Sequence, residues 1–286
     1  MNTQVNNEGT AGQGDTIVMQ LRNDTNSGQG TKNTPVDKPV IALPVNPPAK
    51  NSAVNDNDWV ARNYQILLEQ EKKTIKRFPF EKKDFNIITH QKTDQINFDN
   101  HYLYHTAWAA RVVQKINPVK HVDISSYTYF ATILSAFIPV DYYDYRMLPV
   151  TLDQLHCGTA DLYQLPFEEN SIASLSCMHV VEHVGLGRYG DNPCYDGDLK
   201  AFQELSRVLA VNGDLLFVVP IGKPKIVYNA HRIYSYDQII EAFSGLELLE
   251  FSLITDDKYH GMLKNPDVSV VNSQNYGCGC FWFKKH

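Results

Sequence analysis

The chain has 286 residues, a net charge of −6 and a hydrophobic content of 43%. This length and composition allow a sizeable core, and the negative charge gives no reason to expect nonspecific binding to nucleic acid. The five cysteines are an odd number at scattered positions and show no disulfide framework, so we expect a reducing, cytoplasmic compartment. The first apolar run, 16–21, is too short for a signal-peptide core, and the longest, 129–140, is too short for a membrane span, so we expect neither.

Residues 1–57 differ in composition from the rest of the chain. They are rich in Asn, Gly, Thr and Pro and contain no aromatic residue, the first of which is Trp59. Such a segment cannot bury enough apolar surface to offset the entropy that it would lose on ordering. We therefore expect a disordered tail over 1–57 and a folded domain over 58–286.

The first part of this domain, residues 58–118, has the pattern of helices. Apolar residues recur at intervals of three and four over 58–78, where Asp58 is a candidate N-cap. A second helix is predicted over 101–116, because an Asn-Pro pair follows it directly. These two helices precede the core of the domain, which we expect to span 119–286.

From residue 119 onward, predicted strands alternate with predicted helices. This alternation is typical of an α/β fold whose mostly parallel sheet carries helices on both faces. No clear helix separates the last two strands, which predicts an antiparallel strand at the C-terminus of a Rossmann-like, doubly wound, seven-stranded sheet. The predicted strands are 120–124, 139–144, 156–159, 172–178, 214–219, 246–254 and 276–284, and the predicted helices are 128–137, 197–210 and 235–243.

Acidic residues stand at or just after the ends of three of these strands. In open α/β sheets, ligands bind outside the carboxyl ends of the strands, where Asp123, Asp144 and Asp161 are expected to lie. An acid about 20 residues past the first turn is the expected ligand of ribose hydroxyls, since a carboxylate accepts hydrogen bonds from both. Asp144 has this spacing from the first strand, and Asp141 in the same strand competes for the role.

The turn after the first strand lacks the usual glycines and contains Ser125, Ser126 and Tyr127 instead. Glycines matter most where the backbone approaches a pyrophosphate, so a nicotinamide-dependent oxidoreductase is a weak alternative. The tyrosine could also fill the pocket, which leaves open a protein without a cofactor.

Two runs, "ADLYQLPFEENSIASLSCMHVVEHV" and "AFQELSRVLAVNGDLLFVVP", resemble the class I S-adenosylmethionine-dependent methyltransferases. These proteins commonly have an acid after the third strand, an L-P-F turn, a fourth strand ending near E-H, and then E-x-x-R-V-L before the fifth strand. The resemblance covers roughly 101–286, with Asn212-Gly213-Asp214 where the group often has two glycines. More narrowly, "HVDIS", "DYR", "VEHVGLGRYGD" and "NAHRIYS" resemble DUF268, a family of uncharacterised methyltransferase-like proteins.

The resemblance implies a methyltransferase with S-adenosylmethionine as cofactor, and the expected reaction is O-methylation of a small polar or glycan acceptor. Some DUF268 members are associated with bacterial surface-polysaccharide synthesis, and the alternative is an inactive binding or scaffold protein in a glycan-assembly system. S-adenosylmethionine has no phosphate, so the missing glycines matter less for it. The implied cofactor-binding residues are Asp123 and the serines Ser125 and Ser126 near the methionine end, Asp144 at the ribose, Asp161 and Leu162 at the adenine, and His179 below the sulfonium.

Methyl transfer to a hydroxyl needs a general base and an aligned acceptor. His183 titrates near neutrality and, with Glu182, follows the fourth strand, so these two residues are the candidate catalytic pair. The alternative is that both are structural, because many enzymes of this fold carry E-H here without using it as a base.

Two further segments are candidates for the acceptor site. The glycine-rich run 185–191 carries Arg188 and Asp191, which could hold a polar acceptor or could pair with each other to shape the loop. In "NAHRIYS", His231 and Arg232 are expected to line the acceptor cavity, and the competing interpretation is a surface helix capped by Ser235.

Cys278 and Cys280 form the only close cysteine pair in the sequence. A metal site would need further ligands at a recognisable spacing. We therefore expect no metal here, only two thiols in a strand.

Overall fold

The computed structural model describes residues 56–88, 93, 95–257 and 259–286. The predicted disordered tail lies outside the described residues, apart from its last two positions, which begin helix α1 (Asp56–Glu71). This helix is shorter than the predicted range 58–78, because the backbone N–H groups of Lys73 and Thr74 bond to carbonyls three residues back. Such tight turns are common where a helix ends. Among the described helices, none has both the length and the apolar character needed to cross a bilayer.

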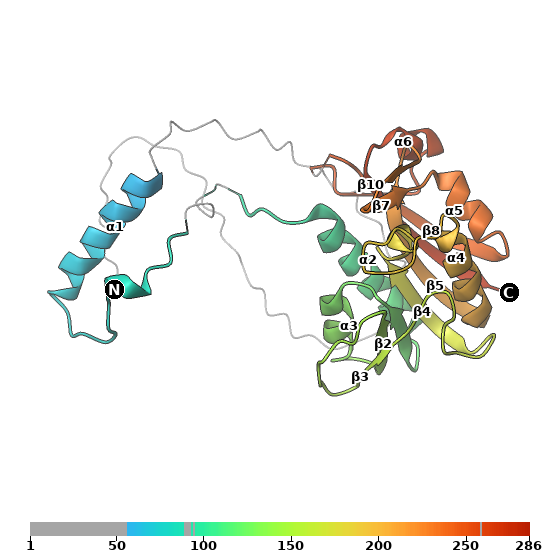
Figure 1. The fold of residues 1–286 in the computed structure, drawn as a ribbon, viewed down its shortest axis with the longest axis horizontal. Coiled ribbons are helices and arrows are strands. Elements are labelled where there is room, and N and C mark those ends of the chain that lie inside the picture. The colour runs from blue at the N-terminus through green and yellow to red at the C-terminus, as the bar shows by residue number, and fades with distance from the viewer. Residues whose placement is uncertain (1–55, 89–92, 94, 258) are drawn as a thin grey trace, which may run out of the picture. The chain divides into compact units, whose positions relative to one another are not determined.

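The core of the protein is a sheet of eight strands in the order β3-β2-β1-β4-β5-β10-β8-β9 (Figure 1). Their bounds are β1 His121–Ile124, β2 Val140–Asp144, β3 Leu155–Thr159, β4 Ile172–Met178, β5 Leu209–Ile221, β8 Leu246–Ile254, β9 Met262–Lys264 and β10 Gly277–Lys285. Strands β1 to β5 pair in parallel, and β10 is antiparallel to both β5 and β8. The predicted fold class is thus confirmed, and β9 adds a short strand at the edge of the seven.

Helices cover both faces of this sheet (Figure 1). Their bounds are α2 Asn100–Ile116, α3 Thr128–Leu134, α4 Gly197–Val208, α5 Tyr236–Ala242 and α6 Val268–Ser273. Trp108 of α2 and Phe130 of α3 belong to one buried apolar cluster, whereas Phe202 of α4 and Ile239 of α5 belong to the other. The burial of apolar surface on both faces is the main force that holds this layered domain together.

Helix boundaries follow from side-chain caps. Asp99 accepts a hydrogen bond from the Tyr102 backbone N–H and starts α2. Ser235 and Gln238 form a reciprocal capping box at the start of α5, so the predicted Ser235 cap is present. Asn117 ends α2 in the left-handed conformation that asparagine tolerates.

Two predictions about the C-terminal half need correction. Strand β5 begins before the predicted range 214–219 and includes an irregularity, where Asn212 has a φ of 61° and a Cβ on Gly213 would lie 2.7 Å from the Ala210 carbonyl oxygen. The expectation that no helix separates the last two strands is wrong, because α6 lies between β9 and β10.

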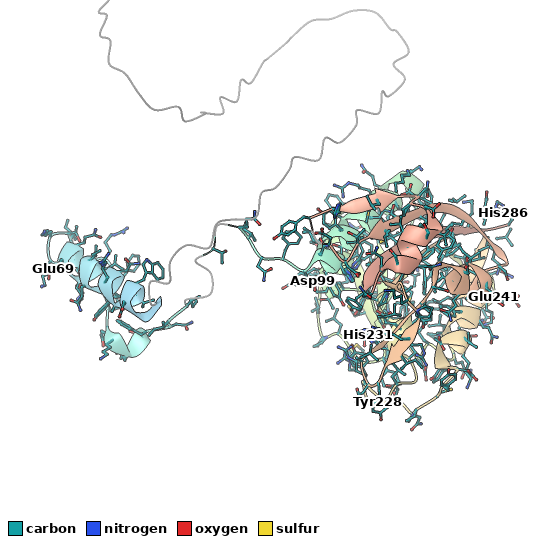
Figure 2. The ribbon with its side chains drawn as sticks, turned by 90° about the horizontal axis from the view of Figure 1, so that it is seen from above. Glu69, Asp99, Tyr228, His231, Glu241 and His286 are labelled. Atoms are coloured by element: carbon teal, nitrogen blue, oxygen red, sulfur yellow. The ribbon has the colours of Figure 1, made fainter. Side chains whose placement is uncertain are left out.

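A separate two-stranded ribbon of β6 (Lys225–Val227) and β7 (His231–Ile233) follows β5. The exposed Tyr228 projects from the turn that joins these two strands (Figure 2).

The strand order determines where a ligand can bind. Along the chain, the sheet grows outward from β1 through β2 to β3, and then returns to the other side of β1 with β4 and β5. The strand order therefore reverses between β1 and β4, and a crevice opens outside the carboxyl ends of strands at such a point. The loops after β1, β2, β3 and β4 all lead to this edge of the sheet.

Candidate active site

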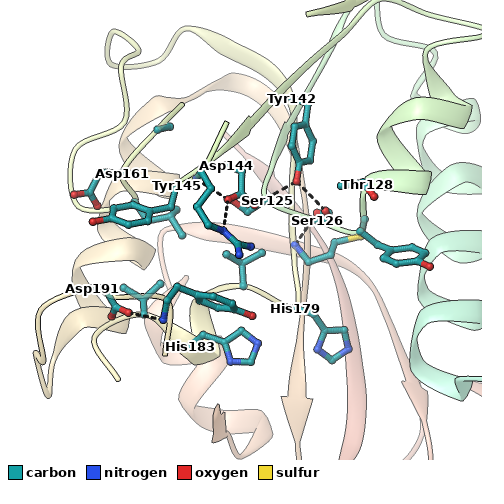
Figure 3. A pocket seen from close by; sticks show the side chains of 18 of the residues that line it. Ser125, Ser126, Thr128, Tyr142, Asp144, Tyr145, Asp161, His179, His183 and Asp191 are labelled. Atoms are coloured by element: carbon teal, nitrogen blue, oxygen red, sulfur yellow. Dashed lines mark hydrogen bonds and ion pairs between the residues drawn. The ribbon is translucent and has the colours of Figure 1, made fainter. Parts of the chain in front are cut away.

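A cavity of about 350 Å³ lies at this edge of the sheet (Figure 3). Its lining comes from the segments that follow β1, β2, β3 and β4, together with Tyr102 of α2. Figure 3 shows Asp144 and Asp161 toward one side of the cavity and His179 and His183 toward another. The lining residues predicted from the sequence are Ser125, Ser126, Asp144, Asp161, Leu162, His179, His183 and Asp191.

The serine-containing turn after β1 keeps a conformation that usually requires glycine. Ser125 has a φ of 57°, and its backbone N–H donates to the Tyr143 carbonyl oxygen at 2.7 Å. A non-glycine residue in this region costs on the order of 1–3 kcal/mol, and such strain is concentrated at functional sites. Tyr127 lines the cavity without filling it, since about 350 Å³ remains, and its ring packs 5.0 Å from that of Tyr102. Ser125 therefore adopts the left-handed backbone conformation that a glycine would usually supply in this turn.

Asp123 lies beneath this turn and does not line the cavity. It is fully buried, and it accepts a hydrogen bond from the Ser176 hydroxyl of β4 and contacts the Ser126 hydroxyl. Ser126 in turn accepts from the Met178 backbone N–H at 3.0 Å. Burial raises the pKa of Asp123 to about 7, and its Oδ2 atom has no hydrogen-bond partner among the described residues. Asp123 thus joins β1 to β4 under the cavity.

Asp144 and Asp141 differ in position although they share one strand. Asp144 lines the cavity, and its Oδ1 accepts from the Arg146 backbone N–H at 2.8 Å. Asp141 instead forms an ion pair with Lys120 at 2.7 Å and does not line the cavity. Of the two candidates for the ribose ligand, only Asp144 is placed where a bound molecule can reach it. Asp161, which follows β3, accepts from the Tyr163 backbone N–H at 2.8 Å and lines the same side.

The turn after β4 brings two histidines to one buried carboxylate. Glu182 Oε1 lies 2.8 Å from His179 Nδ1 and 3.7 Å from His183 Nε2. His183 Nδ1 lies 2.5 Å from the Ala230 carbonyl oxygen, which can only accept. Its proton is therefore assigned to Nδ1 and its lone pair to Nε2, because the partner of one ring nitrogen sets the tautomer. His179 itself has a φ of 58°, so the turn is strained at this residue as well.

Burial sets the charge of this cluster. Burial lowers the pKa of His179 to about 4 and also lowers that of His183 below its usual value, while it raises the pKa of Glu182 to about 7. Desolvation disfavours the charged form of each group, which explains the opposite directions for the histidines and the acid. Both imidazoles are consequently neutral near pH 7, and His183 holds an available lone pair.

A second cavity of about 360 Å³ adjoins the first. The two share the lining residues Tyr102, His179, His183 and Tyr189. Arg188 and His231, predicted for the acceptor site, both line this second cavity. Arg188 Nη1 donates to the Ala230 carbonyl oxygen at 3.0 Å, so the guanidinium is anchored on one side.

Two residues predicted for the acceptor site have other contacts. Asp191 lines the first cavity. It accepts hydrogen bonds from the backbone N–H groups of Gly185 at 2.8 Å and Gly187 at 3.3 Å. Asp191 therefore shapes the glycine-rich loop by binding its backbone and not by pairing with Arg188. Arg232 lines neither cavity, and its assignment to the acceptor site is corrected. It is 5% exposed, donates to the Val184 carbonyl oxygen at 2.7 Å and forms an ion pair with Asp198 at 3.5 Å.

Several lining residues were missed from the sequence. Asn100, His101 and Tyr102 belong to α2, which precedes the first strand, and Tyr276 lies just before β10. Site residues were predicted only at the carboxyl ends of predicted parallel strands. None of the missed residues has such a position, so the sequence pattern did not indicate them. Glu182 was predicted and lines the second cavity.

The model of a family described as Caenorhabditis protein of unknown function, DUF268, matches residues 156–268. The resemblance to DUF268 is therefore confirmed over that part of the chain, which contains the E-H turn and the glycine-rich loop. No curated protein matches the sequence.

Solved structures similar to this chain include several methyltransferases. A putative sarcosine dimethylglycine methyltransferase from Galdieria sulphuraria has 14% identity and a TM-score of 0.46, with 64% of this chain and 86% of that chain covered. A geranyl diphosphate methyltransferase in complex with S-adenosylmethionine has 13% identity and a TM-score of 0.44, with 65% and 87% covered. A putative methyltransferase from Bacillus halodurans has 15% identity and a TM-score of 0.42, with 62% and 98% covered.

The burial of Asp123 leads to a pH-dependent prediction. Its pKa is about 7 in the folded protein and about 4 in an unfolded chain, so the unfolded state loses its proton first as the pH rises. Asp123 therefore destabilises the fold increasingly between about pH 4 and pH 7, and Asp123→Asn removes this effect. The free energy of unfolding of the variant minus that of the wild type should rise across this window, by at most about 1.4 kcal/mol per pH unit, and level off above it.

Denaturant unfolding at a series of pH values measures this difference. The other titrating groups are common to both proteins, so their contributions largely cancel. A difference that does not change with pH would show that Asp123 is not a desolvated acid.

Proposed function

We propose that the protein is an S-adenosylmethionine-dependent methyltransferase that methylates a hydroxyl group of a small polar acceptor. The observation that carries the proposal is the pair of adjoining cavities, with carboxylates on one side and the neutral His183 where they meet. In this proposal, 119–286 together with α2 form the catalytic domain.

The first cavity fits the cofactor in volume and in donor chemistry. Small-molecule sites have volumes of about 300–1,000 Å³, and this cavity has about 350 Å³. Asp144 would accept hydrogen bonds from the ribose hydroxyls, Asp161 and Leu162 would contact the adenine, and the Ser125 hydroxyl would contact the carboxylate end. When bound, S-adenosylmethionine supplies an electrophilic methyl group on its sulfonium.

His183 is the proposed general base. It lines both cavities, and its Nε2 atom holds the lone pair that can take a proton from an acceptor hydroxyl. The Ala230 carbonyl oxygen fixes the ring orientation through Nδ1. Glu182 Oε1, 3.7 Å from Nε2, would stabilise the imidazolium that forms.

The second cavity is the proposed acceptor site. Its lining combines polar groups of Asn100, Arg188 and His231 with the rings of Tyr189 and Tyr276. A sugar presents both hydroxyl groups and an apolar ring face, so a glycan is an acceptor class that suits this lining. Arg188 would orient such an acceptor with the donors that Ala230 does not occupy.

The cofactor site is tested by isothermal titration with S-adenosylmethionine and S-adenosylhomocysteine. We expect micromolar binding to the wild type and a loss of about 1.5–3 kcal/mol, or roughly 10- to 150-fold in affinity, in Asp144→Ala, since a charged hydrogen-bond acceptor is removed. Asp141→Ala is the matched control, because it removes an acid of the same strand outside the cavity, and should bind as the wild type does. No binding to the wild type would contradict the proposal and favour a non-catalytic scaffold protein.

The base is tested by turnover. A panel of sugars and small polar alcohols is screened for release of S-adenosylhomocysteine, and the active acceptor is used for kinetics. His183→Ala should lower kcat by roughly 10²–10⁴-fold with cofactor affinity retained, whereas Arg188→Ala should raise the KM for the acceptor. Because burial lowers the pKa of His183, wild-type activity should persist at pH 6.5 and fall only at lower pH. Unchanged kcat in His183→Ala would assign the base to another residue.

A further inference from the structure

Two imidazoles and a thiol, side chains of types that can bind metals, come from distant parts of the sequence and meet beside the second cavity. His101 comes from α2, His179 from the turn after β4, and Cys278 from the start of β10. One ligand atom of each lies within 4.8 Å of the corresponding atoms of the other two. The sequence contained no spacing signal for this group, since His179 is 99 residues from Cys278.

The distance between two of these atoms matches metal coordination. His179 Nε2 lies 3.4 Å from Cys278 Sγ. In tetrahedral zinc sites the metal lies about 2.0–2.1 Å from a histidine nitrogen and about 2.3 Å from a cysteine sulfur, which separates the two ligand atoms by roughly 3.5 Å. An ion could therefore bind both atoms with little movement of either residue.

The hydrogen bonds leave the required lone pair free. His179 Nδ1 faces Glu182 Oε1 at 2.8 Å, so its proton is assigned there and Nε2 is unprotonated toward the sulfur. Histidine ligands of metals characteristically donate their second ring N–H to a carboxylate in this way. His101 is likewise hydrogen-bonded to the backbone of Tyr276.

Two buried polar atoms in this cluster lack partners among the residues that the structure describes. They are Glu182 Oε2 and His105 Nε2, on residues that are 1% and 0% exposed. The ring of His105 lies 5.1 Å from that of His179, and its Nδ1 is bonded to the His101 carbonyl oxygen at 2.7 Å. Buried polar groups are normally satisfied, so these atoms mark a polar environment around the three side chains, although neither atom is one of the three potential ligands.

Ring packing alone does not account for the cluster. His101 stacks between Tyr276 and His179, at centroid distances of 5.0 and 5.5 Å. Stacking explains why these rings are parallel. It does not account for the Nε2 lone pair of His179 facing the Cys278 sulfur, an arrangement in which both atoms can bind one ion.

We propose that His101, His179 and Cys278 bind one divalent transition-metal ion, of which zinc fits the donor set best. Two imidazoles and one thiolate suit zinc, and three protein ligands leave a fourth position open. That position faces the second cavity, because His101 and His179 both line it. Binding releases the thiol proton of Cys278 to solvent as the sulfur–metal bond forms. This proposal revises the expectation that Cys278 binds no metal. It rests on the positions of the three side chains and does not depend on the proposed methyltransferase activity.

The test is a cobalt titration of the full chain, purified without a histidine tag and freed of metal with a chelator. Co²⁺ bound to a thiolate gives a charge-transfer band in the near ultraviolet. For the wild type we expect this band to reach a plateau at one Co²⁺ per chain and to disappear when Zn²⁺ is added. Absence of the band in the folded wild type would overturn the proposal without reference to any variant.

Variants then assign the ligands. Cys278→Ser should lose the band, while the matched control Cys177→Ser, a cysteine buried in the other apolar cluster, should retain it. Glu182→Gln should keep the band but weaken Co²⁺ affinity by about 10–100-fold, as expected when the carboxylate partner of a histidine ligand is changed. A band that persists in Cys278→Ser would contradict the assignment.

Thermal melting supplies an independent measurement. Zn²⁺ should raise the melting temperature of the wild type and of Cys177→Ser, since an ion that binds only the folded state stabilises it, but not that of Cys278→Ser. S-adenosylhomocysteine binding is measured on the same metal-free samples. Failure of metal binding and failure of cofactor binding are therefore observed separately.

Discussion

A buried hydrogen-bonded bridge joins β1 to β4 at the point where the strand order reverses. Asp123 of β1 accepts from the Ser176 hydroxyl of β4, and Ser126 of the following turn accepts from the Met178 N–H. His121 extends the bridge by contacting the hydroxyls of Ser174 and Ser176. These contacts fix the turn after β1 relative to the turn after β4, and each of those turns holds one residue with a positive φ, Ser125 and His179. The floor of the main cavity depends on this arrangement.

Desolvation governs the chemistry above this floor. The same burial lowers the pKa of the histidines and raises that of Glu182, so both imidazoles are neutral near pH 7 while Glu182 is partly ionised. Neutral imidazoles are what both a general base and a metal ligand require. Within one turn, His183 is oriented toward the two cavities by the Ala230 carbonyl, while His179 is oriented toward Cys278 by Glu182. One carboxylate thus supports two neighbouring histidines with different proposed tasks.

Sequence reasoning predicted the features that depend on local pattern. Alternating strands and helices predicted the sheet, and the acids after β2 and β3 predicted Asp144 and Asp161 in the cavity. Arg232 was assigned to the acceptor cavity, and that assignment was wrong, because its burial against Val184 and Asp198 depends on tertiary packing. The cluster of His101, His179 and Cys278 was missed for the same reason, since only the folded sheet brings α2, β4 and β10 together. The serine turn shows the reverse case, in which composition suggested an altered site while the backbone kept the usual shape.

The central claim is that the loops at the carboxyl ends of β1 to β4 form one cofactor site, and hydrogen exchange tests it directly. Amide exchange is measured by mass spectrometry with and without saturating S-adenosylhomocysteine. A ligand held in this cavity slows the exchange of amides that it covers or orders. The account predicts slower exchange in 125–128, 144–146, 161–163 and 179–183, with no change in α5, which lies outside both cavities. Unchanged exchange in those four segments, or protection confined to another part of the chain, would contradict it.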